Sequence, residues 1–186
     1  YAIFINTDGS CGVFHAVRSE KLAGWTEWKT TTGASFKSVE AVGSRLFFTV
    51  FRNSAYFIEE MGLEANTLDH SSTFTIGSAG TVFTGLSNYA SKTVKVRSGN
   101  FYMGEFAVTS GGQLTLSTGF DTTTITVGYD YDVNIETMPV ETVITAGTLQ
   151  GKPKRISKVI LGLDSALATS VEGNRLVLRQ VTDVLS

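Results

Sequence analysis

The amino-acid sequence predicts an all-β fold, and three observations support this prediction. Val, Ile, Thr and aromatic residues, the types that favour strands, make up 72 of the 186 residues. Short apolar runs separated by turn signals recur about every 8–12 residues, as in sandwiches, barrels and propellers. No stretch with helical periodicity extends beyond about two turns. With 42% hydrophobic and 17% charged residues, the chain also does not belong to the disordered class.

The first 61 residues predict a row of antiparallel strands. Gly9, in the turn that follows Asn6, can supply the positive φ that a tight hairpin needs. Consecutive hairpins with no helix between them are typical of a propeller blade and its neighbour. The strands expected here are Tyr1–Asn6, Gly12–Val17, Leu22–Lys29, Ser35–Val42, Arg45–Arg52 and Tyr56–Glu60. In the fourth of them, Phe36, Ser38 and Glu40 should face away from Lys37, Val39 and Ala41.

The charge balance divides the chain into three parts. Residues 63–140 hold three basic and seven acidic residues, a net charge of −4, whereas the part before them is neutral and the part after them carries +2. We therefore expect a first propeller-like segment at 1–62, an inserted β-sandwich or small barrel at 63–140, and a return into the first sheet system at 141–186. The later strands are expected at Ser72–Ile76, Thr81–Thr84, Thr93–Ser98, Phe101–Val108, Gln113–Leu116, Thr123–Val127, Thr145–Gly151, Ile156–Leu163 and Arg175–Val181, with a turn at Gly77–Gly80.

Few residues are suited to catalysis, so we expect no enzyme. The histidines are His15, in an alternating strand, and His70, in the run Asp69-His70-Ser71. That run contains the three types of a catalytic triad, but neighbours on a strand point to opposite faces and cannot form the relay. Cys11 is the only cysteine, which rules out an internal disulfide, suits a reducing compartment and favours inert packing.

Cofactor and metal sites are not expected either. A zinc site wants four Cys or His ligands, and the chain has three such residues. Asp130, Asp132 and Asn134 lie on one face of a possible strand and could attract calcium, although carboxylates on such a face are usually just solvated. No helix is expected to begin after the Gly-rich run at 77–80, so this run is not expected to form a phosphate-binding loop. No apolar run reaches about 18 residues, so no membrane span is expected.

The strongest local charge feature is a basic cluster of Lys152, Lys154, Arg155 and Lys158. Such side chains can contact the phosphates of DNA, or they can form a solvated loop that keeps a strand edge soluble. The net charge of the whole chain, −2, gives no argument for nucleic-acid binding.

Trp25 and Trp28 are three residues apart in an expected strand, so their side chains should lie on opposite faces. We expect one to pack in the core, against the strands near Phe36–Val42 or Arg45–Arg52, and the other to cover an interface or a strand edge.

Several short runs, in this order, resemble the tail nozzle proteins of short-tailed bacteriophages, also called tail tubular protein B or head–tail stabilisation proteins. The matching runs are Trp25-Thr26-Glu27-Trp28, Thr32-Gly33, Phe36-Lys37-Ser38-Val39, Gly43-Ser44-Arg45-Leu46-Phe47-Phe48, Val50-Phe51-Arg52, Tyr56-Phe57-Ile58-Glu59, Gly85-Leu86-Ser87, Lys92-Thr93-Val94, Ser110-Gly111-Gly112, Leu114-Thr115-Leu116, Val127-Gly128-Tyr129, Ile135-Glu136-Thr137-Met138-Pro139, Gly147-Thr148-Leu149-Gln150-Gly151-Lys152, Lys154-Arg155-Ile156 and Val159. Each run is weak alone, and the order carries the likeness.

This resemblance implies a structural role without catalysis. Nozzle proteins have a propeller-like body with inserted β domains and form rings, usually hexamers, at the distal end of the tail. DNA leaves through the lumen. The partners would be other copies, an adaptor protein and tail fibres, and the protein would be made in the bacterial cytoplasm and located in the virion. The chain, which starts within an expected strand, would be one piece of such a protein.

A carbohydrate-binding β-sandwich that mediates surface adhesion is the alternative, because it would also be rich in strands and threonine. It would use Trp25, Tyr129 or Tyr131 as a stacking platform, with Asp130 and Asp132 for sugar hydroxyls or calcium.

Overall fold

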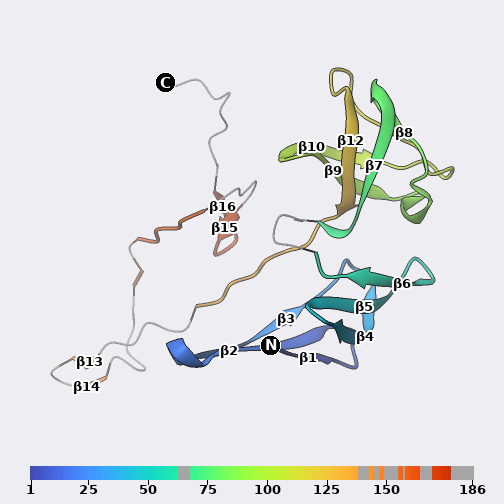
Figure 1. Cartoon of the computed structure of the whole chain (residues 1–186). Helices are drawn as coiled ribbons and strands as arrows, with labels where there is room; N and C mark the ends of the chain where they lie inside the picture. Colours follow the sequence, from blue (N-terminus) through green and yellow to red (C-terminus); the bar gives the residue numbers. More distant parts are fainter. Residues whose placement is uncertain are drawn as a thin grey trace, which may run out of the picture. The chain divides into compact units, whose positions relative to one another are not determined.

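A computed structural model describes residues 1–62, 68–137, 143–144, 147–148, 155–156, 158–163 and 169–176 (Figure 1). Two compact units are present, Tyr1–Ile135 and Glu136–Ser186. All the sheets are antiparallel, and in the described part of the chain none closes into a barrel and no α-helix occurs. The prediction of an all-β chain is therefore confirmed.

The first sheet has the order β1-β2-β3, with β1 at Ala2–Ile5, β2 at Cys11–Val17 and β3 at Leu22–Trp28. A 3₁₀ turn at Arg18–Glu20, η1, joins β2 to β3. In the β1–β2 turn, Gly9 has φ +86°, and a Cβ there would lie 2.4 Å from the Cβ of Ser35. Glycine is required at this position, because a side chain would be strained and would also collide with the start of the second sheet.

The second sheet has the order β4-β5-β6, with β4 at Ser35–Val42, β5 at Arg45–Arg52 and β6 at Ala55–Glu60. Strict alternation along β4 was expected, and this is wrong, because the register shifts between Phe36 and Ser38. The extra residue of a β-bulge moves the following side chains to the other face. As a result Phe36 and Val39 both pack on the core.

These two sheets pack against each other through one face each. The shared core consists of Cys11 and Val13 from β2 and Phe48 and Val50 from β5, all of them buried. The partly buried side chains packed around them are Ile3, Ile5, Trp28, Ala34, Phe36, Val39 and Leu46. The opposite face of each sheet is not covered by the other sheet.

The middle stretch forms its own sheet, of order β10-β9-β12-β7 (Figure 1). Its strands are β7 at Asp69–Gly80, β9 at Thr93–Ser98, β10 at Phe101–Ala107 and β12 at Thr122–Tyr129. A two-stranded sheet of β8 (Val82–Phe83) and β11 (Leu114–Thr115) and a 3₁₀ turn, η2 (Ser87–Tyr89), complete it. Their apolar side chains form a second, separate core that includes Phe83, Leu114 and Ile125.

The turn expected at Gly77–Gly80 is wrong, because these residues belong to β7. On the partner strand β12, Thr124 pairs with Thr75 and Thr122 pairs with Gly80. More residues therefore separate the two pairs on β7 than on β12, and the ladder is irregular between them. The sheet absorbs the extra residues of β7 as a bulge, and two glycines make this easier because they carry no side chain.

The unit after Ile135 contains short hairpins: β13 (Val143–Ile144) with β14 (Gly147–Thr148), and β15 (Thr169–Val171) with β16 (Asn174–Leu176). A strand was expected at 156–163, but the described residues there pair with no strand, and Ile160 is 80% exposed. Apolar, β-branched composition alone does not make a strand without a neighbour to pair with. The three-part division at 63 and 141, and the return into the first sheets, stay predictions.

Candidate functional site

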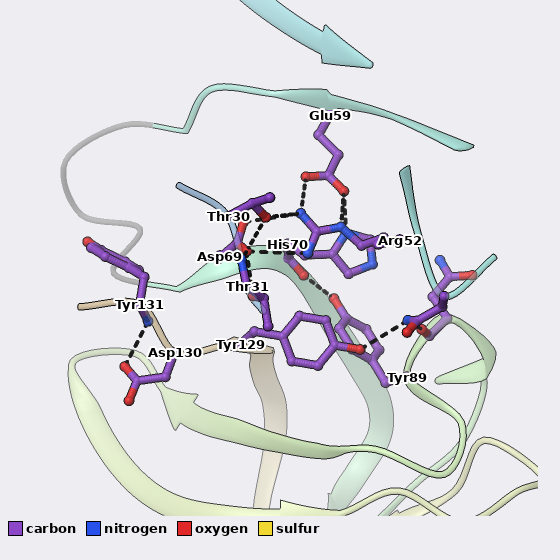
Figure 2. Close-up of polar contacts among 12 residues, drawn as sticks. Thr30, Thr31, Arg52, Glu59, Asp69, His70, Tyr89, Tyr129, Asp130 and Tyr131 are labelled. Atoms are coloured by element: carbon purple, nitrogen blue, oxygen red, sulfur yellow. Dashed lines mark hydrogen bonds and ion pairs between the residues drawn. The ribbon is translucent and has the colours of Figure 1, made fainter. Parts of the chain in front are cut away.

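A buried cluster of charged side chains, which we call the charged joint, connects the second sheet to the middle sheet (Figure 2). Its members are Arg52, Glu59, Asp69 and His70. Arg52 ends β5 on the same face as Phe48 and Val50 and is only 2% exposed. Its Nε lies 2.9 Å from Glu59 Oε1, and its Nη2 donates to Glu59 Oε2 at 3.0 Å. A buried guanidinium is tolerated because carboxylates surround it.

Asp69, the first residue of β7, brings the middle sheet into the joint. The Nη1 of Arg52 donates to Asp69 Oδ2 at 3.3 Å. The same oxygen accepts the Thr30 hydroxyl at 2.7 Å, and the Thr31 hydroxyl and amide at 2.6 and 2.9 Å. Burial alone would raise the pKa of Asp69, but the Thr31 hydroxyl, Arg52, the Thr31 amide and the Thr30 hydroxyl together hold it below its usual range.

His70 completes the joint from the next position of β7. Its Nδ1 lies 2.7 Å from Glu59 Oε1, and its ring stacks on Tyr129 (Figure 2). The same ring packs edge-on to Phe57. The hydroxyl of Tyr89 donates to the His70 carbonyl. Burial raises the pKa of Tyr89 to about 12, which keeps the phenol protonated and able to donate.

The joint attaches the middle sheet to the second sheet through side-chain contacts. Asp69 and His70 meet in one cluster, but they do so through Arg52 and Glu59, not as a triad with Ser71. Asn53, in the β5–β6 turn, adds a second link by donating to the Tyr129 hydroxyl at 3.3 Å. The sequence analysis missed this cluster. One signal was available: Arg52 lies two residues after Val50 and therefore on the core-facing side of the strand. A buried arginine needs a carboxylate beside it.

The outer face of the second sheet exposes apolar side chains among polar ones that include Ser38, Glu40 and Thr49. It carries Val42, Phe47, Phe51, Tyr56 and Ile58, of which Ile58 is 81% exposed and Tyr56 69%. Phe51 and Tyr56 pair across the strands, with ring centroids 4.9 Å apart. An ion pair between Arg45 and Glu60 lies at one end of this face, and Arg45 also covers the Phe47 ring. Exposed apolar faces of this kind mark interaction surfaces.

A second exposed surface, which we call the aromatic platform, lies on the outer face of the first sheet. It consists of Phe4, Phe14 and Trp25, one residue from each strand. The Trp25 ring lies 4.9 Å from the Phe14 ring and 5.9 Å from the Phe4 ring, centroid to centroid. Trp25 remains 66% exposed, whereas Trp28 points to the opposite face and packs on the core.

The basic cluster is only partly within the described residues. Arg155 and Lys158 are exposed, while Lys152 and Lys154 lie outside the described ranges. His15 is exposed and stacks on the Tyr1 ring at 4.3 Å between centroids. Cys11 is buried in the core of the first two sheets, and burial raises the pKa of its thiol to about 11, so it is a poor nucleophile.

The acidic side chains near the end of β12 are exposed to solvent. Asp130 pairs with Lys95 at 2.5 Å, and Asp132 and Asn134 are exposed. Within the described ranges, no group of three or more His, Cys, Asp or Glu side chains could hold a metal ion. No helix in that same part of the chain has the length and apolar character needed to cross a membrane.

Comparisons with protein-family models, with curated proteins and with solved structures find no match to this chain.

Proposed function

We propose that the chain is a structural part of the tail nozzle of a short-tailed bacteriophage, that it is located in the virion, and that it helps to form the channel through which DNA leaves. The proposal combines the ordered resemblance of the sequence runs with the way the first two sheets are packed. It includes assembly of the full-length protein into a ring and no catalytic step.

The observation that carries the proposal is that the second sheet exposes large apolar side chains on the face that lies opposite its core. Its inner face packs on the first sheet through Phe48 and Val50, and its outer face exposes Tyr56 and Ile58. A strand that is solvated on one face alternates apolar and polar residues, whereas β5 places Phe47 and Phe51 on the outer face as well as Phe48 and Val50 on the inner one. A sheet with large apolar side chains on both faces suits the middle of a stack, and sheets stacked face to face are how propeller blades are arranged.

The charged joint supports the same role. Arg52 and Glu59 form the ion pair at the centre of the charged joint, and each belongs to one of the runs that carry the resemblance. A buried ion pair adds little net stability compared with apolar side chains, but breaking it is costly. Such a contact favours one fixed attachment of the middle sheet, which is what an inserted domain in a ring needs.

The basic cluster of Lys152, Lys154, Arg155 and Lys158 fits this role as a contact to the acidic middle region of a neighbouring subunit. A channel through which DNA slides should not hold it tightly, and every phosphate that a lysine neutralises strengthens binding. Complementary charges on neighbouring subunits would instead set their register in the ring.

Electron microscopy and native mass spectrometry of the full-length protein test the assembly. We expect a ring with an axial channel, and we expect Ile58→Glu together with Tyr56→Glu to reduce ring formation, because they place charges on the outer face of the second sheet. Glu20→Gln, away from that face, serves as the control. A full-length protein that stays monomeric at all concentrations would contradict the proposal.

The basic cluster is tested separately with Lys154→Glu combined with Arg155→Glu. Ring assembly should fall while the chain stays folded by circular dichroism, and the unchanged chain should bind duplex DNA weakly or not at all at physiological salt. The contrary result would be tight DNA binding with a steep salt dependence that the double change abolishes while ring assembly is unaffected. That result would assign the cluster to the DNA channel.

A further inference from the structure

We propose that the chain binds a phosphate group, as inorganic phosphate or at the end of a small phosphate monoester, in a pocket between the second sheet and the middle region. This site is separate from the nozzle assembly and does not depend on it. Three features of the pocket support it: the way its walls are held together, the charge of its lining, and a strained turn at its rim.

The pocket has a volume of about 320 Å³, and three segments of the chain form it. They are the turn between β3 and β4, the end of β5 with the β5–β6 turn, and the side chains of Lys92 and Tyr129 from the middle region. Thr31 and Arg52 both donate to Asp69 Oδ2, and the guanidinium of Arg52 lies 6.0 Å from the centre of the Tyr129 ring. These contacts fix the walls relative to one another. The volume lies at the lower end of the range of about 300–1,000 Å³ that is usual for small-ligand sites.

The charge of the lining is positive. Its ionised side chains are Arg52 and Lys92, and none of the described residues that line it is Asp or Glu. The carboxylates that neutralise Arg52, those of Glu59 and Asp69, belong to the charged joint and do not line the pocket. Lys92 is exposed and forms no ion pair with any described residue. Its charge is therefore available to an anion in the pocket.

Hydrogen-bond donors add to this charge. The hydroxyls of Thr32 and Ser54 line the pocket, and no described residue accepts a hydrogen bond from either. The Tyr129 oxygen accepts from Asn53 Nδ2 at 3.3 Å, which leaves the phenolic proton free for a ligand. Phosphate oxygens accept hydrogen bonds, and a lysine is a common partner for them. A lining of donors around one unpaired lysine therefore suits a phosphate group.

The β5–β6 turn is strained in a way that supports a binding role. Arg52 pairs with Ala55, so the turn has two residues, Asn53 and Ser54, whose φ angles are +50° and +62°. Such angles belong to a type I′ turn, in which glycine is the preferred second residue. Ser54 costs strain that a glycine would avoid, and strain of this kind gathers at functional sites. In return, Ser54 brings to the pocket a hydroxyl that a glycine would lack.

The directions of the donors favour a phosphate over a carboxylate. Thr32 comes from one turn, Ser54 from a second and Lys92 from the middle region, so the donors surround a ligand instead of lying in one plane. A terminal phosphate carries three acceptor oxygens and a charge of about −1.5 to −2, whereas a carboxylate has two oxygens in one plane and a single charge. A small pocket bounded by three segments also admits a terminal phosphate more easily than a continuous DNA backbone.

The test is an NMR titration of the full chain with sodium phosphate at pH 7, with the ionic strength held constant by sodium chloride. The amide signals of Thr32, Gly33 and Ser54 should shift and saturate, whereas those of β10, away from the pocket, should stay in place. Sodium acetate over the same concentrations is the comparison anion and should give no saturable shift in these signals.

Lys92→Gln should weaken phosphate binding about fivefold, the usual effect of losing an exposed ion pair. Lys21→Gln removes an exposed lysine that does not line the pocket, so it is the matched control and should leave the affinity unchanged. Ser54→Gly should also weaken binding, but it should not lower the urea midpoint of the chain, because glycine relieves the strain of the turn. A residue with a purely structural role would show the opposite pattern.

Several results would overturn the inference: shifts that do not saturate or that lie outside the pocket, equal weakening by Lys92→Gln and Lys21→Gln, or acetate binding as tight as phosphate binding. A short oligothymidylate that displaces phosphate from these amides at lower concentration would also overturn it, by assigning the pocket to a DNA backbone. Ring formation by the full-length protein is measured in phosphate-free buffer, so the outcome for the nozzle proposal is decided independently.

Discussion

The middle sheet and the first two sheets use their apolar side chains differently. In the middle region, twelve described side chains are buried in one core, among them Tyr89, Leu86 and Val96. In the first two sheets the corresponding core has four buried members, while Trp25, Tyr56 and Ile58 are largely exposed. The middle region buries most of its apolar side chains, and the first two sheets leave more of theirs exposed.

This difference separates residues that matter for folding from residues that matter for association. Removing a buried side chain from the middle core should lower stability, because the space it leaves stays largely empty. Removing an exposed side chain from an outer face should hardly change the folding of the chain and should act on assembly instead. The charged joint connects the two regions, so it should show the largest effect of all.

Arg52→Met is expected to have the largest effect. It leaves Glu59 and Asp69 without their cation in a mostly buried place, and breaking a buried ion pair in this way costs about 3–5 kcal/mol of unfolding free energy. Urea unfolding followed by circular dichroism measures the loss. Arg45→Met removes the exposed ion pair with Glu60 and should change stability little. Equal losses in the two variants would mean that the joint is no more than a surface salt bridge.

Leu114→Ala should lower the stability of the middle region by about 2–5 kcal/mol, because Leu114 is fully buried in its core. Both tryptophans lie in the first sheet, so their fluorescence reports on that region alone. We expect the transition seen by circular dichroism to shift more than the transition seen by tryptophan fluorescence. Identical shifts would show that the two cores unfold as one cooperative unit.

Protonation of Asp69 at low pH should destabilise the charged joint. Its pKa is lowered in the folded chain, so its contribution to stability is present above the unfolded pKa, about 3.9, and is lost as the pH falls through the folded value. Urea unfolding between pH 5 and pH 2.5 should therefore show falling stability. Asp69→Asn should flatten this dependence, since an amide does not titrate. An unchanged slope in the variant would assign the acid sensitivity to other carboxylates.

Ile58→Ala should have the smallest effect on the isolated chain, within about 0.5 kcal/mol, because this side chain is 81% exposed. In the full-length protein the same change should reduce ring assembly, which size-exclusion chromatography with light scattering would detect. A large loss of stability in the isolated chain would mean that the outer face of the second sheet is already covered there.

The sequence predicted most of the strands well where local signals agree. β4, β5 and β9 have the expected bounds, because runs of strand-favouring residues end at turn residues such as Gly43 and Asn53. It did less well where pairing overrides composition. β7 runs through a Gly-rich stretch because β12 pairs with it on both sides of the irregularity, and the apolar residues at 158–163 form no strand because none pairs with them.

By itself, then, the sequence determined the all-β class, the hairpins of the first 60 residues and the opposite orientations of Trp25 and Trp28, since all of these follow from the two-residue period of a strand. Only the tertiary structure decided that Arg52, Glu59, Asp69 and His70 meet, because their contact depends on how the second sheet and the middle sheet come together. It also decided which faces remain exposed, because the same alternating pattern is compatible with any partner that covers its apolar side.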